Sequence, residues 1–300
     1  MKANSKLFKG SQSIILAACC YGMLGTFVKL AYKDGYNTAE VTISQFFLGF
    51  IVLFIFTIIS RKSVAAVKAP QENLKSCVKL IVAGTSLGFT SIFYYMAVKY
   101  IPVSICIVLL VQAVWMSLVV EMLQKQKQPE FSKIATVVII IFGTLIATDV
   151  WHQYNQINWT GVAWGLLAAL SYTATIYSSN NIELGFPPIK RSFLMVSGGF
   201  ITVLLVFCSS LLQGFSFSIL LNWGILVALF GTILPPLLFA KGMPLTGMGL
   251  GAIFTSLEIP VAILFAHLLL NEYVSVGQWL GVLLIIIAVI LKNIQIKNHN

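Results

Sequence analysis

Ten stretches of about 20 predominantly apolar residues follow one another along the sequence, separated by short connections. A helix needs roughly 20 such residues to cross a hydrocarbon core about 30 Å thick. The 300-residue chain is 58% hydrophobic and only 9% charged, whereas a soluble domain carries about 25% charged residues. We therefore expect an all-α integral membrane protein with ten transmembrane helices. The expected spans are 12–32, 41–60, 77–98, 102–123, 132–150, 160–180, 192–213, 219–240, 245–270 and 275–294.

Basic residues are distributed unevenly between the two ends of these spans. With the N-terminus inside, 16 of the 19 lysines and arginines fall in or beside inner connections. The three exceptions, Lys29, Lys33 and Lys99, fall at outer ends. Because basic residues collect on the cytoplasmic side of a membrane, both termini are expected in the cytoplasm. We expect a multi-pass protein of the cell membrane, with a bacterial inner membrane as the expected location.

Two parts of the chain repeat each other weakly. The segment "AACCYG" at 17–22 matches "AALSYT" at 168–173, since both contain Ala-Ala-x-x-Tyr. The segment "LVQAVW" at 110–115 aligns with "SLEIPV" at 256–261. Self-similarity at a fixed period indicates a repeated structural unit, and here the unit is about 150 residues long.

The repeat divides the predicted spans into two groups of five. We expect a first five-helix repeat at 1–150 and a second at 151–300, which together form one membrane domain. Because five is odd, the second copy enters the membrane in the opposite sense. Two inverted five-helix repeats around a central site are typical of secondary transporters.

The C-terminal part of the sequence resembles EamA-type proteins of the drug/metabolite transporter superfamily. The resemblance rests on Pro260-Val261, Leu270-Asn271-Glu272, Gln278 and Gly281, together with "WGLLAALSYT" at 164–173. The first half departs from the family pattern, with Tyr21-Gly22 in place of Trp-Gly and Gln45 where arginine is common. The resemblance implies ten helices, cytoplasmic termini and solute transport, often export, and it does not identify the substrate.

Glu258 is the first candidate for a functional residue, because it lies about midway along its predicted span. An ionised carboxylate there costs roughly 2.5–3.5 kcal/mol and should face the bundle interior. Helical spacing places Gly251, Thr255, Glu258 and Ala262 on one face, and Pro260 is expected to free the carbonyl of Ser256. The alternative is a packing kink in which Glu258 pairs with a neighbouring hydroxyl.

Other polar and aromatic residues are candidates for the same site. Gln112 is the repeat counterpart of Glu258, although an interhelical hydrogen bond is an equally good explanation for it. Tyr21 and Tyr172 occupy matching positions in the two repeats, among small residues that allow either close packing or a cavity. The complete set of predicted substrate-binding residues is Glu258, Gln112, Tyr21, Tyr172, Trp164, Tyr95 and Thr255.

Several further features are interpreted as structural. His267 lies nine residues after Glu258, so a helix turns it to the opposite face. Glu121 and Lys29 are near span ends, where long side chains reach the headgroups. The segment "GTSLG" at 84–88 resembles a nucleophile elbow, but it lies in an apolar helix, where two glycines four residues apart favour helix contact. The segment "GMGLG" at 247–251 lacks the spacing and setting of a dinucleotide-binding loop.

These features favour a secondary active transporter that exports a small metabolite, such as an amino acid or a related amphipathic solute, by alternating access. A passive channel or uniporter is the alternative. An enzyme is not expected, because the three histidines and five cysteines form no reactive or metal-binding pattern. No cofactor and no nucleic-acid partner are expected; the partners are the solute and the lipid bilayer. The sequence does not determine the oligomeric state, because lipid-facing and partner-facing apolar surfaces look alike.

Overall fold

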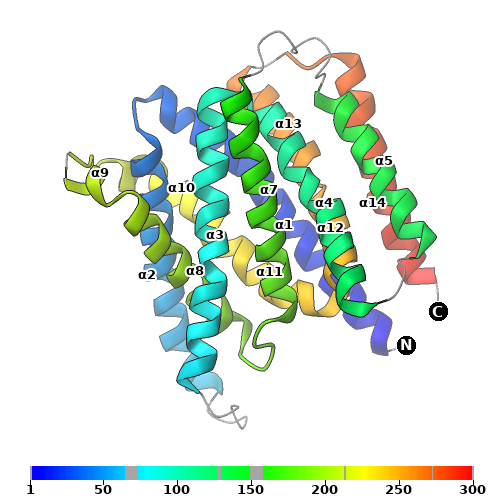
Figure 1. Ribbon diagram of the computed structural model, residues 1–300, viewed down its shortest axis with the longest axis horizontal. Helices are drawn as coiled ribbons and strands as arrows, with labels where there is room; N and C mark the ends of the chain where they lie inside the picture. Colours follow the sequence, from blue (N-terminus) through cyan, green and yellow to red (C-terminus); the bar gives the residue numbers. More distant parts are fainter. Residues whose placement is uncertain are drawn as a thin grey trace.

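The computed structural model describes residues 2–64, 73–126, 130–148, 158–212, 214–271 and 273–298, which form helices and short connections (Figure 1). The predicted boundary between the repeats, at residue 150, and Glu272 of the family pattern lie outside the described residues. The helices are α1 (Lys2–Lys33), α2 (Thr38–Val64), α3 (Leu74–Tyr100), α4 (Val103–Lys125), α5 (Phe131–Thr148), α7 (Trp159–Asn181), α8 (Pro188–Val206), α9 (Cys208–Leu212), η2 (Leu220–Gly224), α10 (Ile225–Ala228), η3 (Leu229–Ile233), α11 (Leu234–Thr246), α12 (Met248–Thr255), α13 (Glu258–Leu270) and α14 (Val276–Asn298).

Several segments of the chain, made of one helix or of consecutive short helices, are long and apolar enough to cross a membrane. Seven segments meet this criterion among the described residues, and α5 and α14 contain shorter apolar segments. The prediction of an all-helical membrane protein is confirmed, whereas the count of ten spans stays a prediction. The seven segments are Lys6–Lys33, Thr38–Ser60, Leu74–Tyr100, Ile105–Lys125, Pro188–Val206, Leu220–Thr246 and Met248–Leu270.

Helices from the first half of the chain pack mainly against helices from the second half. The helix α1 contacts α11 and α13, and α7, its counterpart in the sequence repeat, contacts α3 and α4. In addition, α3 and α2 both pack on α8, and α5 lies along α14 (Figure 1). The two halves are therefore interleaved rather than separate. The start of α1 and the end of α14 lie at the same end of the bundle (Figure 1).

The crossing of α3 and α8 depends on glycines that bring the two backbones into contact. A Cβ at Gly84 would overlap the backbone of Met195, and one at Gly198 would overlap the carbonyl of Ile81. Without a hydrophobic force between helices in lipid, such small residues allow the close packing that holds them together. The interpretation of "GTSLG" at 84–88 as a helix-contact segment is confirmed.

Arg191 joins three helices although it is buried, with 1% of its surface exposed. Pro244 inside α11 has no N–H to donate to the carbonyl of Ala240, four residues earlier. The Arg191 guanidinium supplies that donor at 3.0 Å and also donates to the carbonyl of Ser179 at 2.6 Å. Ser179 lies in the last turn of α7, where helix carbonyls lack partners within the helix. The charge pattern counts Arg191 only as a cytoplasmic marker. In the structure it donates to two backbone carbonyls, one in α11 and one in α7, that have no N–H partner within their own helices.

We predict that Gly198→Ala lowers the free energy of unfolding by about 1–3 kcal/mol, because the added methyl group must push α3 away from α8. Gly277→Ala is the matched control, since its added Cβ would have its nearest contact at 3.7 Å, with Ser275 Oγ. Thermal unfolding of both variants in one detergent measures the difference. Equal melting temperatures for the two variants would contradict the proposed role of the crossing.

Candidate functional site

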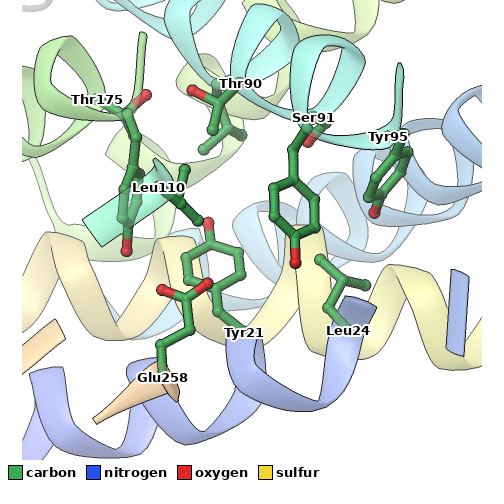
Figure 2. A pocket seen from close by; sticks show the side chains of 11 residues that line it. Tyr21, Leu24, Thr90, Ser91, Tyr95, Leu110, Thr175 and Glu258 are labelled. Carbon is green, nitrogen blue, oxygen red and sulfur yellow. The ribbon is translucent and has the colours of Figure 1, made fainter. Parts of the chain in front are cut away.

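A small cavity lies between α1, α3, α4, α7 and α13 (Figure 2). Its volume is about 40 Å³, which admits a few water molecules. One carboxylate and four tyrosines face it together with hydroxyl and leucine side chains. The lining residues are Tyr21, Leu24, Leu87, Thr90, Ser91, Tyr94, Tyr95, Leu110, Tyr172, Thr175 and Glu258.

Glu258 reaches the cavity because the helix is interrupted just before it. The break between α12 and α13 falls at Ser256 and Leu257, and Glu258 is the first residue of α13. The carboxylate is 7% exposed and points into the cavity toward Tyr21 (Figure 2). The expectation that Pro260 leaves the carbonyl of Ser256 without a partner is wrong, because the N–H of Ile259 donates to it at 3.1 Å. A tightened turn replaces the lost helical hydrogen bond.

The helix α1 approaches this break closely. A Cβ at Gly22 would lie 2.6 Å from the carbonyl oxygen of Glu258, so only glycine permits this packing. Tyr21 therefore lies beside the start of α13, with its ring against the carboxylate-bearing turn. The Tyr-Gly pair thus combines a side chain that lines the cavity with a backbone position that lets α1 come near.

The two tyrosines predicted from the repeat contact each other. The rings of Tyr21 and Tyr172 lie 6.0 Å apart in an edge-to-face arrangement at 89°, and each ring also contacts Phe239 of α11. The buried Tyr172 hydroxyl is near Glu258 and Thr255, yet it makes no well-formed hydrogen bond to a described residue. The Tyr172 hydroxyl thus lies beside the carboxylate of Glu258 at the edge of the cavity.

Tyr95 contributes its ring to the cavity and directs its hydroxyl to Gln45 of α2, which accepts a short hydrogen bond. Both side chains are fully buried. The backbone carbonyl of Gln45 accepts a separate hydrogen bond from the hydroxyl of Thr232 in η3 at 2.9 Å. Gln45, which stands where the family pattern favours arginine, therefore links α2, α3 and the irregular span that contains α11.

Three predicted site residues lie outside the lining. Gln112 donates to the carbonyl of Val108 and accepts from the exposed Trp115, whereas the residue of α4 that lines the cavity is Leu110. Two helical steps turn a side chain by about 200°, so Gln112 faces away from Glu258. Trp164 instead packs its ring on a phenylalanine of α3, and Thr255 bonds the carbonyl of Ala252 behind the lining.

The helix α3 supplies lining residues that the sequence-based prediction missed. Leu87, Thr90, Ser91 and Tyr94 line the cavity beside Tyr95, which is one of the predicted residues. Their spacing of three and four residues places them on one face of a helix. A stripe of hydroxyl and aromatic side chains at this spacing was the signal that could have identified them.

Other residues singled out in the sequence have structural positions. His267 is exposed and packs edge to face on Trp279, away from the cavity as helical spacing predicted. Glu121 does not reach outward to the headgroups; it is 6% exposed and accepts from the N–H of Gly249 at the start of α12. It also pairs with Lys125 and Lys133. The glycines of "GMGLG" leave room for this carboxylate.

A bundle of apolar helices whose two halves enclose a buried carboxylate at a helix break defines a polytopic membrane protein of the transporter type. The EamA-like transporter family matches residues 8–148 and 159–294, and the chain belongs to this family. The two matches are its two repeats, and the resemblance noted in the sequence is confirmed. The family indicates a membrane transporter of small solutes.

Comparison with solved structures supports the fold. A structure titled "Crystal structure of protein" is similar with a TM-score of 0.68 and 12% identity, over 95% of this chain and 99% of that chain. At this identity the likeness shows the fold alone. No curated protein sequence matches the chain.

We predict that Tyr95→Phe destabilises the protein by about 1–2 kcal/mol, because it leaves the buried side-chain oxygen of Gln45, Oε1, without its donor. Tyr100→Phe is the control, since Tyr100 is 39% exposed. Thermal unfolding in detergent measures both. A melting temperature for Tyr95→Phe equal to that of Tyr100→Phe would show that the hydrogen bond contributes nothing to the packing of α2 on α3.

Proposed function

We propose that this protein is a secondary active transporter that exports a small amphipathic metabolite, such as an amino acid or a related amine, by alternating access. The observation that carries the proposal is the position of Glu258. It is a buried carboxylate at a helix break, in a cavity lined by both halves of the chain. Interrupted helices at the interface of two repeats form the substrate sites of many transporters.

The packing of the helices supports two inverted five-helix repeats, at 1–150 and 151–300. Under an exchange of the repeats, the contact of α1 with α11 corresponds to that of α7 with α3, and the contact of α1 with α13 corresponds to that of α7 with α4. Termini at one end fit an even number of spans, and the lysine distribution favours placing that end in the cytoplasm of a bacterial cell.

The size of the cavity supports a cycle in which the site opens and closes. Small-molecule sites usually have volumes of about 300–1,000 Å³, far above the roughly 40 Å³ present here. Binding of a metabolite therefore requires the side chains around Glu258 to separate. Phe239, which packs on both Tyr21 and Tyr172, belongs to α11. The helix α11 follows the π-helical segment η3 and has two prolines in its first turn. π-Helical turns within helices occur frequently at functional sites.

The composition of the lining favours a solute with a positive group. Glu258 is the only carboxylate that lines the cavity, and no lysine or arginine lines it among the described residues. Tyrosine faces attract cations, especially where water is excluded. An ammonium group between Glu258 and the tyrosines would satisfy both. The small volume of the cavity, about 40 Å³, argues against a permanently open channel.

We predict that Glu258→Gln reduces the initial rate of transport at least roughly tenfold, because the loss of one buried charge contact costs 1.4 kcal/mol or more. Proteoliposomes would first be screened with radiolabelled amino acids and amines. The variant and the wild-type protein would then be compared across pH on the best solute. The titratable side chains near Glu258 are Tyr21, Tyr94 and Tyr172.

His267→Gln is the control, since it removes a titratable group from the same helix outside the cavity. It should keep the wild-type rate and pH profile. A Glu258→Gln variant that transports at the wild-type rate with an unchanged pH profile would refute the role of this carboxylate.

A further inference from the structure

The three lysines that depart from the charge bias of the sequence line one cleft. Lys29 and Lys33 come from the last turns of α1, and Lys99 comes from the end of α3. The cleft has a volume of about 480 Å³, within the range of small-molecule sites. Its remaining lining residues are Tyr32, Tyr36, Asn37, Thr38 and Val98. It lies at the end of the bundle opposite to the start of α1 (Figure 1).

The acids nearest in sequence to this cleft are held by other donors. The indole of Trp223 donates to Asp34 at 2.7 Å. Glu40 accepts from the backbone N–H of Ser216 at 2.9 Å and from that of Asn37 at 2.8 Å. No described acid lines the cleft itself. The described lining residues therefore include no acid that could neutralise Lys33 or Lys99.

A second cleft of similar size provides a contrast. It has a volume of about 450 Å³ and contains one lysine, Lys79, which pairs with Glu183 at 3.4 Å. In the part of the chain that the structure describes, neither Lys33 nor Lys99 forms an ion pair with an acid, and Lys99 lies over the ring of Tyr100. The unusual feature of the first cleft is thus a concave surface in which two lysines, Lys33 and Lys99, face no acid among the described lining residues.

The depth of the lysines indicates which anion they meet. Lys33 is the last residue of the span Lys6–Lys33, and Lys99 is next to the last residue of the span Leu74–Tyr100. Span ends lie at the level of the lipid headgroups. Lysine binds phosphate as a point charge, and the side-chain oxygen of Asn37 already accepts from Glu40 N–H, which leaves its NH₂ group as a donor.

We propose that the cleft formed by Lys29, Lys33 and Lys99 binds a phosphate group, carried either by a lipid headgroup or by a soluble phosphate ester. The site is separate from the cavity around Glu258 and does not depend on the transported solute. It adjoins that cavity, because Tyr32 of the cleft donates to the carbonyl of Tyr95 at 3.3 Å, and Tyr95 lines the cavity. A ligand in the cleft would therefore lie against Tyr32, which is hydrogen-bonded to a residue that lines the cavity around Glu258.

Two binding measurements on the full-length protein distinguish the sources of phosphate. In one, titration calorimetry measures binding of sn-glycerol 3-phosphate to the protein in phosphatidylcholine nanodiscs. In the other, native mass spectrometry counts phosphatidylglycerol retained from mixed micelles, relative to phosphatidylcholine. The double variant Lys33→Gln/Lys99→Gln should weaken binding roughly 30-fold in whichever measurement detects the ligand, because each lysine near a membrane surface contributes about a factor of five.

Control variants test whether charge in the cleft is the cause. Lys33→Arg/Lys99→Arg should retain binding. Lys75→Gln/Lys241→Gln removes the same charge from exposed positions outside the cleft and should bind like the wild-type protein. Binding of glycerol phosphate supports a soluble ester as the ligand, and retention of phosphatidylglycerol alone supports a lipid. Absence of both, or binding equally strong in the Lys33→Gln/Lys99→Gln variant, would overturn the proposal, whatever the outcome of transport assays on Glu258→Gln.

Discussion

Where α3 crosses α8, the backbones touch because glycine occupies the contact on both helices. Lipid tails are as apolar as leucine, so burial in a membrane does not drive helices together, and close packing must. The same device recurs at the crossing of α1 with α11, at that of α5 with α14, and where α1 meets α13. Each of these crossings joins one half of the chain to the other. The central cavity exists only between the halves, and so its geometry depends on these contacts.

The helices themselves were predictable because lipid leaves few alternatives to apolar stretches of about 20 residues. The irregular course of the span from Leu220 to Thr246 was not predictable in this way. Its π-helical segments and prolines leave backbone groups that distant residues must satisfy, as Arg191 does for Ala240. Which distant side chain donates to a backbone carbonyl left free in an irregular helix depends on the tertiary structure. The pattern of residue types along the sequence does not reveal it. For the same reason Arg191 looked like a topological marker.

The lining of the candidate site was predictable where burying a residue in the membrane has a large energetic cost, and less so elsewhere. A carboxylate at mid-membrane must face the interior, and Glu258 does. Tyr21 and Tyr172 followed from the repeat and meet in the structure. Gln112 was also chosen from the repeat, but its side chain lies outside the cavity lining. Its amide satisfies itself along its own helix, which removes any need to face a cavity. Homologous register therefore does not fix which way an uncharged side chain points.

The distribution of charge across the two sites leads to one further step. The cavity contains a carboxylate and, among its described lining residues, no basic side chain, while the cleft beyond Tyr95 contains lysines and no acid. A lone charge is costly inside a membrane, so in the proposed transport cycle Glu258 would be either protonated or paired with a positive group of the solute. Since one carboxylate would hold only one of these at a time, proton and solute would compete for it. Such competition would couple the two without any additional residue, and export against a gradient would then require protons to enter as the solute leaves.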